Sequence, residues 1–359
     1  MRKALALVLS VILSLSCHPS KAPEPAPEPP EAVAFIAAAD ISSYPEIEMS
    51  QPVFYAEDGR QAHFLDILKA GGVNTIRLRL WVNPGSAHSG LEEVEAFARR
   101  LRAMGFRLWL ALHYSDTWAD PGRQEMPARW RSLDFARLKD SVREYTRNVT
   151  ERLRPEFIQI GNEINSGFLH PAGHLTQNPQ QFRALLSAAA QAVRAASPGS
   201  KILLHFAGLE NAPAFFQQQV AGVDYDIIAL SYYPIWHGKD LALLQAVLRQ
   251  LGQRKPVVIA ETAYPFTLGW NDWTTNIVGL PEQLILPDYP ATPQGQWDFL
   301  RQIRRIVRAT PGGLGFCYWG AEWIAWKGPT ATDGSPWENQ ALFDFDHRAL
   351  PVLRAFRED

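Results

Sequence analysis

Short apolar runs alternate along the chain with longer stretches in which apolar residues recur every three or four positions. The short runs fit buried β-strands, because polar, glycine or proline residues bound each of them. The predicted strands are Phe35–Ile41, Thr75–Trp81, Arg107–His113, Phe157–Gly161, Lys201–Ala207, Ile227–Tyr232, Pro256–Ala260 and Leu314–Trp319. The predicted amphipathic helices are Gln61–Ala70, Leu91–Met104, Asp134–Leu153, Pro179–Ala196, Asp240–Leu251 and Gln294–Ala309.

Strands that alternate with helices are typical of α/β folds, and eight of them predict a closed (β/α)8 barrel, or TIM barrel. A doubly wound open sheet is the alternative. Folds of that kind that bind phosphate have a glycine-rich turn after the first strand, whereas Asp40–Ser43 has no glycine. We therefore expect a single α/β barrel over residues 33–359.

The first residues have the pattern of an export signal. Arg2 and Lys3 precede the apolar run Ala4–Leu15, which is too short to span a bilayer comfortably. We expect residues 1–16 to be a signal peptide. A small residue directly before Cys17 resembles a lipoprotein cleavage site, so Cys17 is expected to become a lipid-carrying amino terminus. A plain secretory signal is the alternative.

Residues 17–32 join the signal to the predicted barrel. The segment 19–30 reads PSKAPEPAPEPP, and it lacks the large apolar residues that a packed core needs. Such a segment forms a stiff, extended tether. The order of signal, lipid anchor, tether and barrel predicts an exported protein at the cell surface or outer membrane. Without the lipid, the protein would be periplasmic or secreted.

Composition narrows the possible partners. Among 359 residues, 35 Lys and Arg balance 37 Asp and Glu, which gives no electrostatic footprint for nucleic acid. The two cysteines exclude a disulfide framework and a cysteine-rich zinc site. The 12 Trp residues either fill the core or stack on sugar rings. We expect a monomer without nucleic-acid partners.

Two glutamates close predicted strands. Glu163 follows the fourth strand and Glu261 the seventh. Each could pair with an arginine such as Arg77 or Arg79, since a buried charge is costly when it is unpaired. Strands four and seven face one another across a barrel mouth, however, so the two carboxylates can meet over a substrate. Two carboxylates about 5 to 5.5 Å apart suit a retaining glycosidase.

Longer segments around these glutamates resemble one family, the arabinogalactan endo-β-1,4-galactanases of glycosyl hydrolase family 53. The similarity extends in order from about residue 35 to about residue 356, and HYSDTWADPG at 113–122 is its most specific segment. The other similar segments are ADIS at 39–42, IRLRLW at 76–81, QIGNEI at 159–164, LSYYP at 230–234, ETAYP at 261–265 and YW at 318–319.

The resemblance implies a retaining enzyme that cleaves β-1,4-galactan, the side chain of plant pectin. Glu163 would be the general acid/base and Glu261 the nucleophile. We expect Arg77 or Tyr233 to keep Glu261 ionised, and the charge of Glu261 to help Glu163 retain its proton. Asn162 is expected to bind the sugar 2-hydroxyl. The candidate substrate-binding residues are Asp40, Arg77, Trp81, His113, Asp116, Trp118, Asn162, Tyr233 and Trp319, and Trp236 is a further candidate stacking platform.

Two segments depart from the family pattern. Gly320-Ala321-Glu322 stands where the family often has Glu-Pro. In the long loop 266–290, bacterial relatives can bind calcium, but Asn271–Asn276 contains a single carboxylate, Asp272. We therefore expect no metal or other cofactor, with calcium in this loop as the alternative.

The sequence alone leaves two other functions open. Another retaining β-glycanase, such as a mannanase, would use the same pair of glutamates. A surface glycan-binding lipoprotein that has lost its activity would be expected to lack one of the glutamates or the residues that support them, and both are present here.

Overall fold

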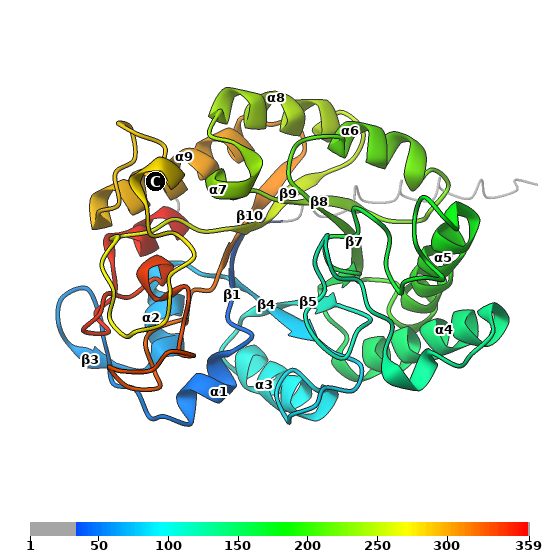
Figure 1. Ribbon diagram of the computed structural model, residues 1–359, viewed down its shortest axis with the longest axis horizontal. Coiled ribbons are helices and arrows are strands. Elements are labelled where there is room, and N and C mark those ends of the chain that lie inside the picture. Colours follow the sequence, from blue (N-terminus) through cyan, green and yellow to red (C-terminus); the bar gives the residue numbers. More distant parts are fainter. Residues whose placement is uncertain (1–33, 358–359) are drawn as a thin grey trace, which may run out of the picture. The chain divides into compact units, whose positions relative to one another are not determined.

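The computed structural model describes residues 34–357, so the predicted signal peptide, Cys17 and the proline-rich tether lie outside the described residues. Parallel strands close into a barrel in the order β1-β10-β9-β8-β7-β6-β5-β4 (Figure 1). The predicted (β/α)8 barrel is confirmed. Its strands are β1 (Ile36–Asp40), β4 (Thr75–Leu80), β5 (Arg107–Leu112), β6 (Phe157–Ile160), β7 (Lys201–Ala207), β8 (Ile227–Ser231), β9 (Val257–Thr262) and β10 (Gly313–Trp319).

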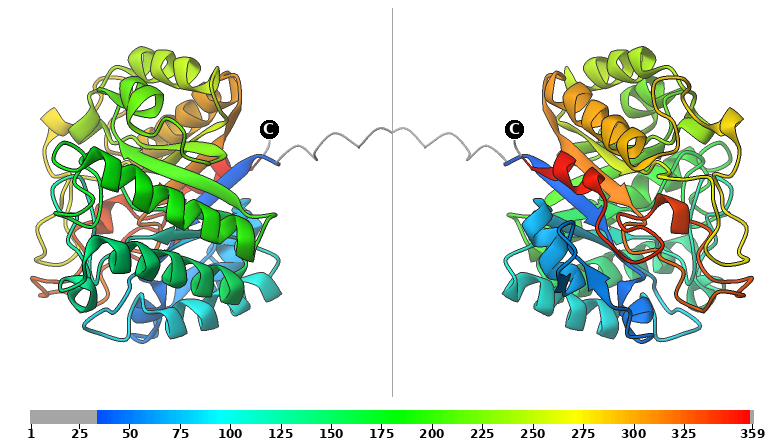
Figure 2. Two further views of the ribbon diagram at one scale, coloured as in Figure 1. Left: turned by 90° about the vertical axis from the view of Figure 1, so that its right-hand side faces the viewer. Right: turned by 90° about the vertical axis from the view of Figure 1, so that its left-hand side faces the viewer.

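Helices surround the barrel, as the side views show (Figure 2). The longer ones are α2 (Phe64–Gly71), α3 (Leu91–Ala103), α4 (Phe135–Leu153), α5 (Pro179–Ala196), α8 (Leu241–Gly252) and α9 (Pro293–Arg308). The shorter helices and turns are α1 (Tyr44–Glu48), η1 (Ala128–Trp130), α6 (Ala212–Ala214), η2 (Phe215–Gln219), α7 (Pro234–His237), η3 (Pro281–Gln283), η4 (Glu338–Gln340) and η5 (Pro351–Phe356). Among residues 34–357, no helix is long and apolar enough to cross a membrane.

One predicted helix begins later than expected. Gln61 and Ala62 form β3 (Gln61–Ala62), which pairs in antiparallel fashion with β2 (Phe54–Tyr55) outside the barrel. The His63 side chain then accepts a hydrogen bond from the Leu65 amide and caps α2. The prediction of a helix over 61–70 was therefore wrong at its start, because a cap and a strand pairing set the boundary.

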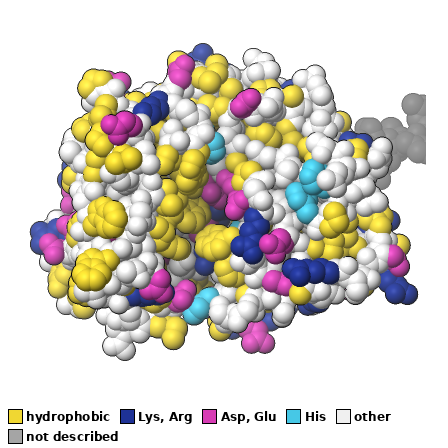
Figure 3. All heavy atoms as spheres, viewed as in Figure 1, with side chains coloured by type: hydrophobic (Ala, Val, Ile, Leu, Met, Phe, Trp, Pro, Cys, Tyr) yellow, Lys and Arg dark blue, Asp and Glu magenta, His cyan; other side chains and the backbone are white. Residues whose placement is uncertain are grey.

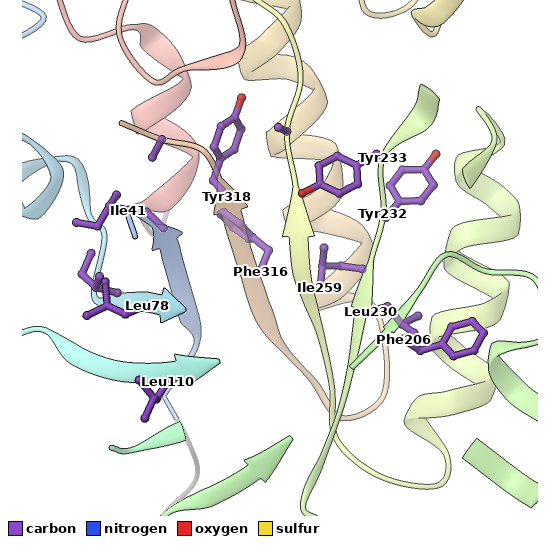
Figure 4. Close-up of a cluster of buried hydrophobic side chains, with 14 of the residues drawn as sticks. Ile41, Leu78, Leu110, Phe206, Leu230, Tyr232, Tyr233, Ile259, Phe316 and Tyr318 are labelled. Atoms are coloured by element: carbon purple, nitrogen blue, oxygen red, sulfur yellow. The ribbon is translucent and has the colours of Figure 1, made fainter. Parts of the chain in front are cut away.

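Alternate residues along the strands face opposite sides of the barrel wall. In β4, Arg77 contacts side chains on β1, β6 and β9, so it points into the barrel. Its neighbours Ile76 and Leu78 point the other way and belong to the hydrophobic core. Figure 4 shows Leu78 and other buried apolar side chains on neighbouring strands. An apolar exterior packed under helices therefore encloses a polar barrel interior.

Candidate active site

A cavity of about 420 Å³ opens at the carboxyl-terminal mouth of the barrel. Figure 3 shows acidic side chains in a hollow beside a wall of hydrophobic side chains. Both predicted catalytic glutamates and all but two of the predicted substrate-binding residues line the cavity. The lining residues are Asp40, Arg77, Arg79, His113, Trp118, Ala119, Asp120, Pro121, Asn162, Glu163, Ala207, Tyr233, Trp236, His237, Glu261, Trp319 and Trp337.

Glu261 is held by two donors. Arg77 Nη2 lies 2.7 Å from Glu261 Oε1, and the Tyr233 hydroxyl donates to Oε2 at 3.1 Å. The predicted contacts with Arg77 and Tyr233 are confirmed. Glu261 lies within β9, whereas its predicted strand ended at Ala260. Because the strand backbone and both donors fix its carboxylate, Glu261 is oriented for attack from one position.

Arg77 sits at the centre of the barrel interior and is almost fully buried. Its guanidinium lies over the Trp109 ring, 5.7 Å from the ring centroid, and it also pairs with Asp40 at 2.7 Å. Burial opposes the charge of Arg77, but Glu261 and Asp40 outweigh burial and raise its pKa. The arginine therefore stays charged and offsets the cost of burying two carboxylates.

Glu163 follows β6 and meets Glu261 in the cavity. It has a left-handed φ of 48°, a conformation that costs energy for a residue other than glycine. Ser231 Oγ donates to Glu163 Oε1 at 2.5 Å. A carboxylate oxygen of Glu163 lies within 4.8 Å of one of Glu261. This separation fits direct attack by one carboxylate better than the wider spacing, about 6.5 to 9.5 Å, of inverting enzymes.

The two carboxyl groups have different proton affinities. Burial, and then the charge of Glu261, raise the pKa of Glu163 to about 8. Burial also raises the pKa of Glu261, but Arg77 and the hydrogen bond from Tyr233 oppose that rise. The proton that the pair retains near neutral pH therefore belongs on Glu163. Burial is the larger cause of the raised pKa, whereas the sequence pointed only to the neighbouring charge.

His205 lies beside this pair, and one polar atom of each of the three side chains lies within 4.8 Å of the others. Such a cluster has the ligand types of a metal site. However, Arg77 forms an ion pair with Glu261 in the same space, and a guanidinium repels a metal cation. The arrangement therefore fits acid/base chemistry better than metal binding.

Asn162 and His113 also face the cavity. Asn162 Oδ1 accepts from Arg77 Nη2 at 2.8 Å, and its Nδ2 donates to the Ala119 carbonyl. His113 Nδ1 accepts from the Ala119 amide at 3.2 Å. Burial and the charges of Arg77 and Arg79 keep the pKa of His113 well below 6.5. His113 is therefore neutral with its proton on Nε2, where it can donate to a sugar hydroxyl.

Tryptophans form the wall of the cavity. Trp118 and Trp319 are 6.0 Å apart between ring centroids, and Trp319 lies 4.6 Å from Trp337. Trp236 extends this wall and is 54% exposed. Trp337 was not among the predicted site residues, because it lies in a loop far from any predicted strand end.

Trp81 and Asp116 lie outside the set of cavity-lining residues. Trp81 packs edge-on against Trp118 at 5.5 Å. The two carboxylate oxygens of Asp116 accept hydrogen bonds from the backbone amides of Asn83 and Ala128. In this structure Trp81 supports a lining residue and Asp116 braces two loops, and neither lines the cavity itself.

Glu322, one of the departures from the family pattern, is buried behind the cavity. Its Oε1 accepts from the Ser43 amide at 2.8 Å. Burial and the nearby Asp40 raise the pKa of Glu322 to about 8. Glu322 is therefore a neutral side chain through much of the acidic and neutral range, and it anchors the loop after β1.

A second group of buried polar atoms lies where the loop after β9, which holds Asp272 and Asn276, meets η4 after β10, which holds Glu338. Asp272 Oδ2, Asn276 Oδ1 and Glu338 Oε2 have no hydrogen-bond partner within residues 34–357. All three side chains are more than 90% buried. The structure thus places a second carboxylate, Glu338 of η4, beside the loop residue Asp272 that the sequence identified. Carboxylate and amide oxygens are the ligands that Ca²⁺ prefers.

Comparison with known proteins shows which family this chain resembles. The family model for glycosyl hydrolase family 53 matches residues 36–356. An arabinogalactan endo-beta-1,4-galactanase from Cellvibrio japonicus is 34% identical over 346 residues, which cover 90% of this chain and 91% of that protein. An endo-beta-1,4-galactanase from Bacillus subtilis is 31% identical and covers 90% of this chain and 85% of that protein.

Solved structures agree with this result. The GH53 catalytic domain of Ignisphaera aggregans has a TM-score of 0.85 and 39% identity, and the match covers 93% of this chain and 98% of that one. A fungal beta-1,4-galactanase has a TM-score of 0.78. A GH113 beta-1,4-mannanase has a TM-score of 0.52 at 12% identity, which reflects the shared barrel alone. The chain belongs to glycosyl hydrolase family 53.

Proposed function

We propose that the protein is a retaining endo-β-1,4-galactanase that cleaves β-1,4-galactan and type I arabinogalactan. The observation that supports this most is the carboxylate pair, Glu163 and Glu261, whose oxygens approach within 4.8 Å. Their partners are unequal, because only Glu261 forms an ion pair with Arg77. Membership of glycosyl hydrolase family 53 and the galactanase names of the relatives support the substrate.

In the first step, Glu163 donates its proton to the glycosidic oxygen while a Glu261 oxygen attacks the anomeric carbon. The bond to the leaving sugar breaks and a glycosyl–Glu261 ester forms. In the second step, Glu163, now a carboxylate, takes a proton from water as that water attacks the same carbon. Two inversions give net retention. Arg77 and Tyr233 stabilise the carboxylate of Glu261 before attack and when it is released.

The product anomer and a substrate panel test this function. Proton NMR of galactan hydrolysis should show the β-anomer first, and the α-anomer first would overturn the retaining mechanism. Reducing-sugar release should be highest on β-1,4-galactan when β-1,3-galactan, mannan and xylan are compared, and Glu261→Gln should abolish it. Preference for mannan would favour the mannanase alternative, and binding without release would favour an inactive glycan-binding protein.

We also propose that the loop after β9 and η4 can together hold a calcium ion, through Asp272 and Asn276 of the loop and Glu338 of η4. The support is that each contributes a buried oxygen that has no hydrogen-bond partner within residues 34–357. Burial raises the pKa of Glu338, so a cation beside its carboxylate would offset the cost of burying that charge. The ion would brace the loop between β9 and α9 and would take no part in the reaction.

For the amino-terminal segment we propose export followed by lipidation of Cys17, which would hold a monomeric enzyme at the cell surface. The support lies in the signal-like run Ala4–Leu15 and the small residue before Cys17. Metabolic labelling with a fatty acid should mark the wild-type protein and spare Cys17→Ser, which should leave the membrane fraction. A Cys17→Ser protein that stays membrane-bound would contradict the anchor. Light scattering at micromolar concentration should give the mass of one chain.

A further inference from the structure

A second cavity, of about 640 Å³, forms a side cavity next to the catalytic cavity at the barrel mouth. The two cavities share Ala207, Trp236 and His237 in their linings, so they are continuous. From these shared residues the side cavity extends to Glu210 and Ala214, which are both exposed. A bound sugar chain could therefore pass from the catalytic cavity into the side cavity.

The two catalytic glutamates divide the barrel mouth into a shorter and a longer arc. Glu163 follows β6 and Glu261 lies in β9, and only β7 and β8 stand between them on the shorter arc (Figure 1). The side cavity lies on this arc, since Ala207 ends β7 and His237 follows β8. Most other residues of the catalytic cavity come from β1, β4, β5 and β10, on the longer arc. A substrate that crosses the pair would place one side of its cleaved bond on each arc.

His237 lies at the junction of the two cavities and has a defined tautomer. Its Nδ1 lies 3.0 Å from the backbone nitrogen of Tyr233. A backbone amide can only donate, so Nδ1 accepts and carries no proton. Burial lowers the pKa of His237 to about 4, so the ring is neutral near pH 7 and its one proton lies on Nε2. Within residues 34–357, no hydrogen bond uses that proton.

The ring of His237 is held where it can meet a ligand. A Cβ atom at Gly208 would lie 2.9 Å from Cδ2 of the ring, and the φ of 85° at this position also favours glycine. The rings of Tyr232 and Tyr233 lie 6.5 and 6.0 Å from the His237 ring between centroids. Close packing on these neighbours keeps the Nε2 proton at the junction of the cavities.

We propose that the side cavity binds the galactosyl residues on the leaving-group side of the scissile bond, and that His237 Nε2 donates to one of their hydroxyls. Glu163 protonates the leaving oxygen and borders this cavity, because Asn165, two residues later, lines it. Trp236 offers an apolar ring face to the same sugars. The sugar that forms the ester with Glu261 then occupies the longer arc. This assignment rests on the proposed galactanase function.

Replacement of His237 by Asn tests the proposed donor. The Asn oxygen can still accept from the Tyr233 amide, but the Nε2 proton is lost. Loss of one hydrogen bond to a neutral hydroxyl should lower kcat/KM on galactan by about threefold to tenfold. An aryl β-galactobioside has no sugar on its leaving side, so its kcat/KM should change by less than about twofold. As a control, His347→Asn removes a histidine that contacts the Val53 carbonyl and should match the parental enzyme on both substrates.

Replacement of Ala214 by Trp tests the cavity without changing His237. Ala214 is exposed in α6 and lines the side cavity, so a large ring at this position should fill that cavity and leave the catalytic cavity open. Its kcat/KM should fall on galactan and stay unchanged on the aryl substrate. Galactohexaose labelled with oxygen-18 at its reducing end reports which bond is cut. Weaker binding on the leaving side should move the cut toward the label, so both variants should release shorter labelled fragments.

Equal losses on galactan and on the aryl substrate in both variants would overturn the assignment, as would parental rates and a parental cleavage pattern. Failure of the galactanase function has a different signature, because the parental enzyme would then release no sugar from galactan. If the parental enzyme hydrolyses galactan and both variants cut labelled galactohexaose at the parental bonds, only the role of the side cavity is wrong.

Discussion

The barrel mouth and the loop after β9 both bury carboxylates, but they satisfy them differently. In the mouth, Glu261 is bound by Arg77 and Tyr233, whose side chains come from β4 and from the end of β8. In the loop, Asp272 Oδ2 has no hydrogen-bond partner within residues 34–357, and neither has Oε2 of Glu338, which packs against the loop from η4. Buried polar groups usually have partners, so a group without one calls for an explanation.

The difference shows what strand register does for a catalytic site. Neighbouring strands in a barrel set donors and acceptors at fixed heights, so that a buried charge meets its partner when the barrel closes. A long loop has no register to do this. The chemistry of the buried oxygens at this loop fits the cation proposed above.

Replacement of the proposed nucleophile should have the largest effect on activity. Glu261→Ala removes the attacking group, so galactan hydrolysis should fall by roughly 10⁵-fold. Initial rates of reducing-sugar release measure this directly, with Glu92→Ala on the exposed face of α3 as a control that should keep full activity. A Glu261→Ala enzyme that keeps more than about 1% of the rate would show that this carboxylate is not the nucleophile.

The exposed tryptophans give a second contrast between the two regions. Trp236 lines the cavity and is 54% exposed, whereas Trp273 lies in the loop and is 65% exposed. Stacking on a sugar ring at Trp236 predicts that Trp236→Ala raises KM on galactan about tenfold with little change in kcat. Trp273→Ala is the matched control. Equal changes in KM in both variants would contradict a specific role of Trp236 in stacking on the substrate.

The response of thermal stability to calcium tests the site proposed at the loop after β9. Added Ca²⁺ should raise Tm by several degrees after treatment with a chelator, because a ligand that binds the folded state stabilises it. Asp272→Asn should abolish the increase, whereas Asp333→Asn should retain it, because Asp333 is exposed and pairs with Lys327. A Tm that does not respond to Ca²⁺ in the parental protein would contradict the site.

The smallest expected effect is a change in the pH dependence of Tm when Glu322 is replaced. Its pKa rises from 4.5 to about 8 on burial, so the folded state holds a proton that the unfolded state has lost between these values. Stability from this group is therefore complete below about pH 4.5 and declines as pH rises through about 8. Glu322→Gln cannot ionise, so its Tm should fall less than the parental Tm between pH 5 and pH 9. Parallel Tm curves would contradict the raised pKa.

The barrel and its two glutamates could be predicted because both follow from strand periodicity. Runs such as Val257–Ala260 indicated buried strands, and the end of each strand indicated the mouth. Helix starts were harder, since the start of α2 depends on the pairing of Gln61 and Ala62 with β2, a neighbouring two-residue strand that is too short to show a periodic pattern. The contacts of Asp116 with the Asn83 and Ala128 amides could not be predicted, because a carboxylate that braces a loop and one that binds a sugar look alike in sequence.

Residues that act through others were harder to identify from sequence. His205 and Ser231 interrupt apolar runs, which was a usable signal, but only the folded structure shows that they meet at Glu163. Glu338 lies 66 residues after Asp272, so the sequence of the loop alone does not indicate that the two residues meet. Contacts between distant segments, rather than local patterns, decide these positions.

Opposite azide anomers from the two glutamate variants would test the central claim most directly. In Glu163→Ala, an aryl β-galactobioside should still form the ester at Glu261, and azide, which needs no base, should release it as the β-glycosyl azide. In Glu261→Ala, azide must attack the substrate itself and should give the α-azide. We predict these two products. The same anomer from both variants, or the two results interchanged, would contradict the roles assigned to Glu163 and Glu261.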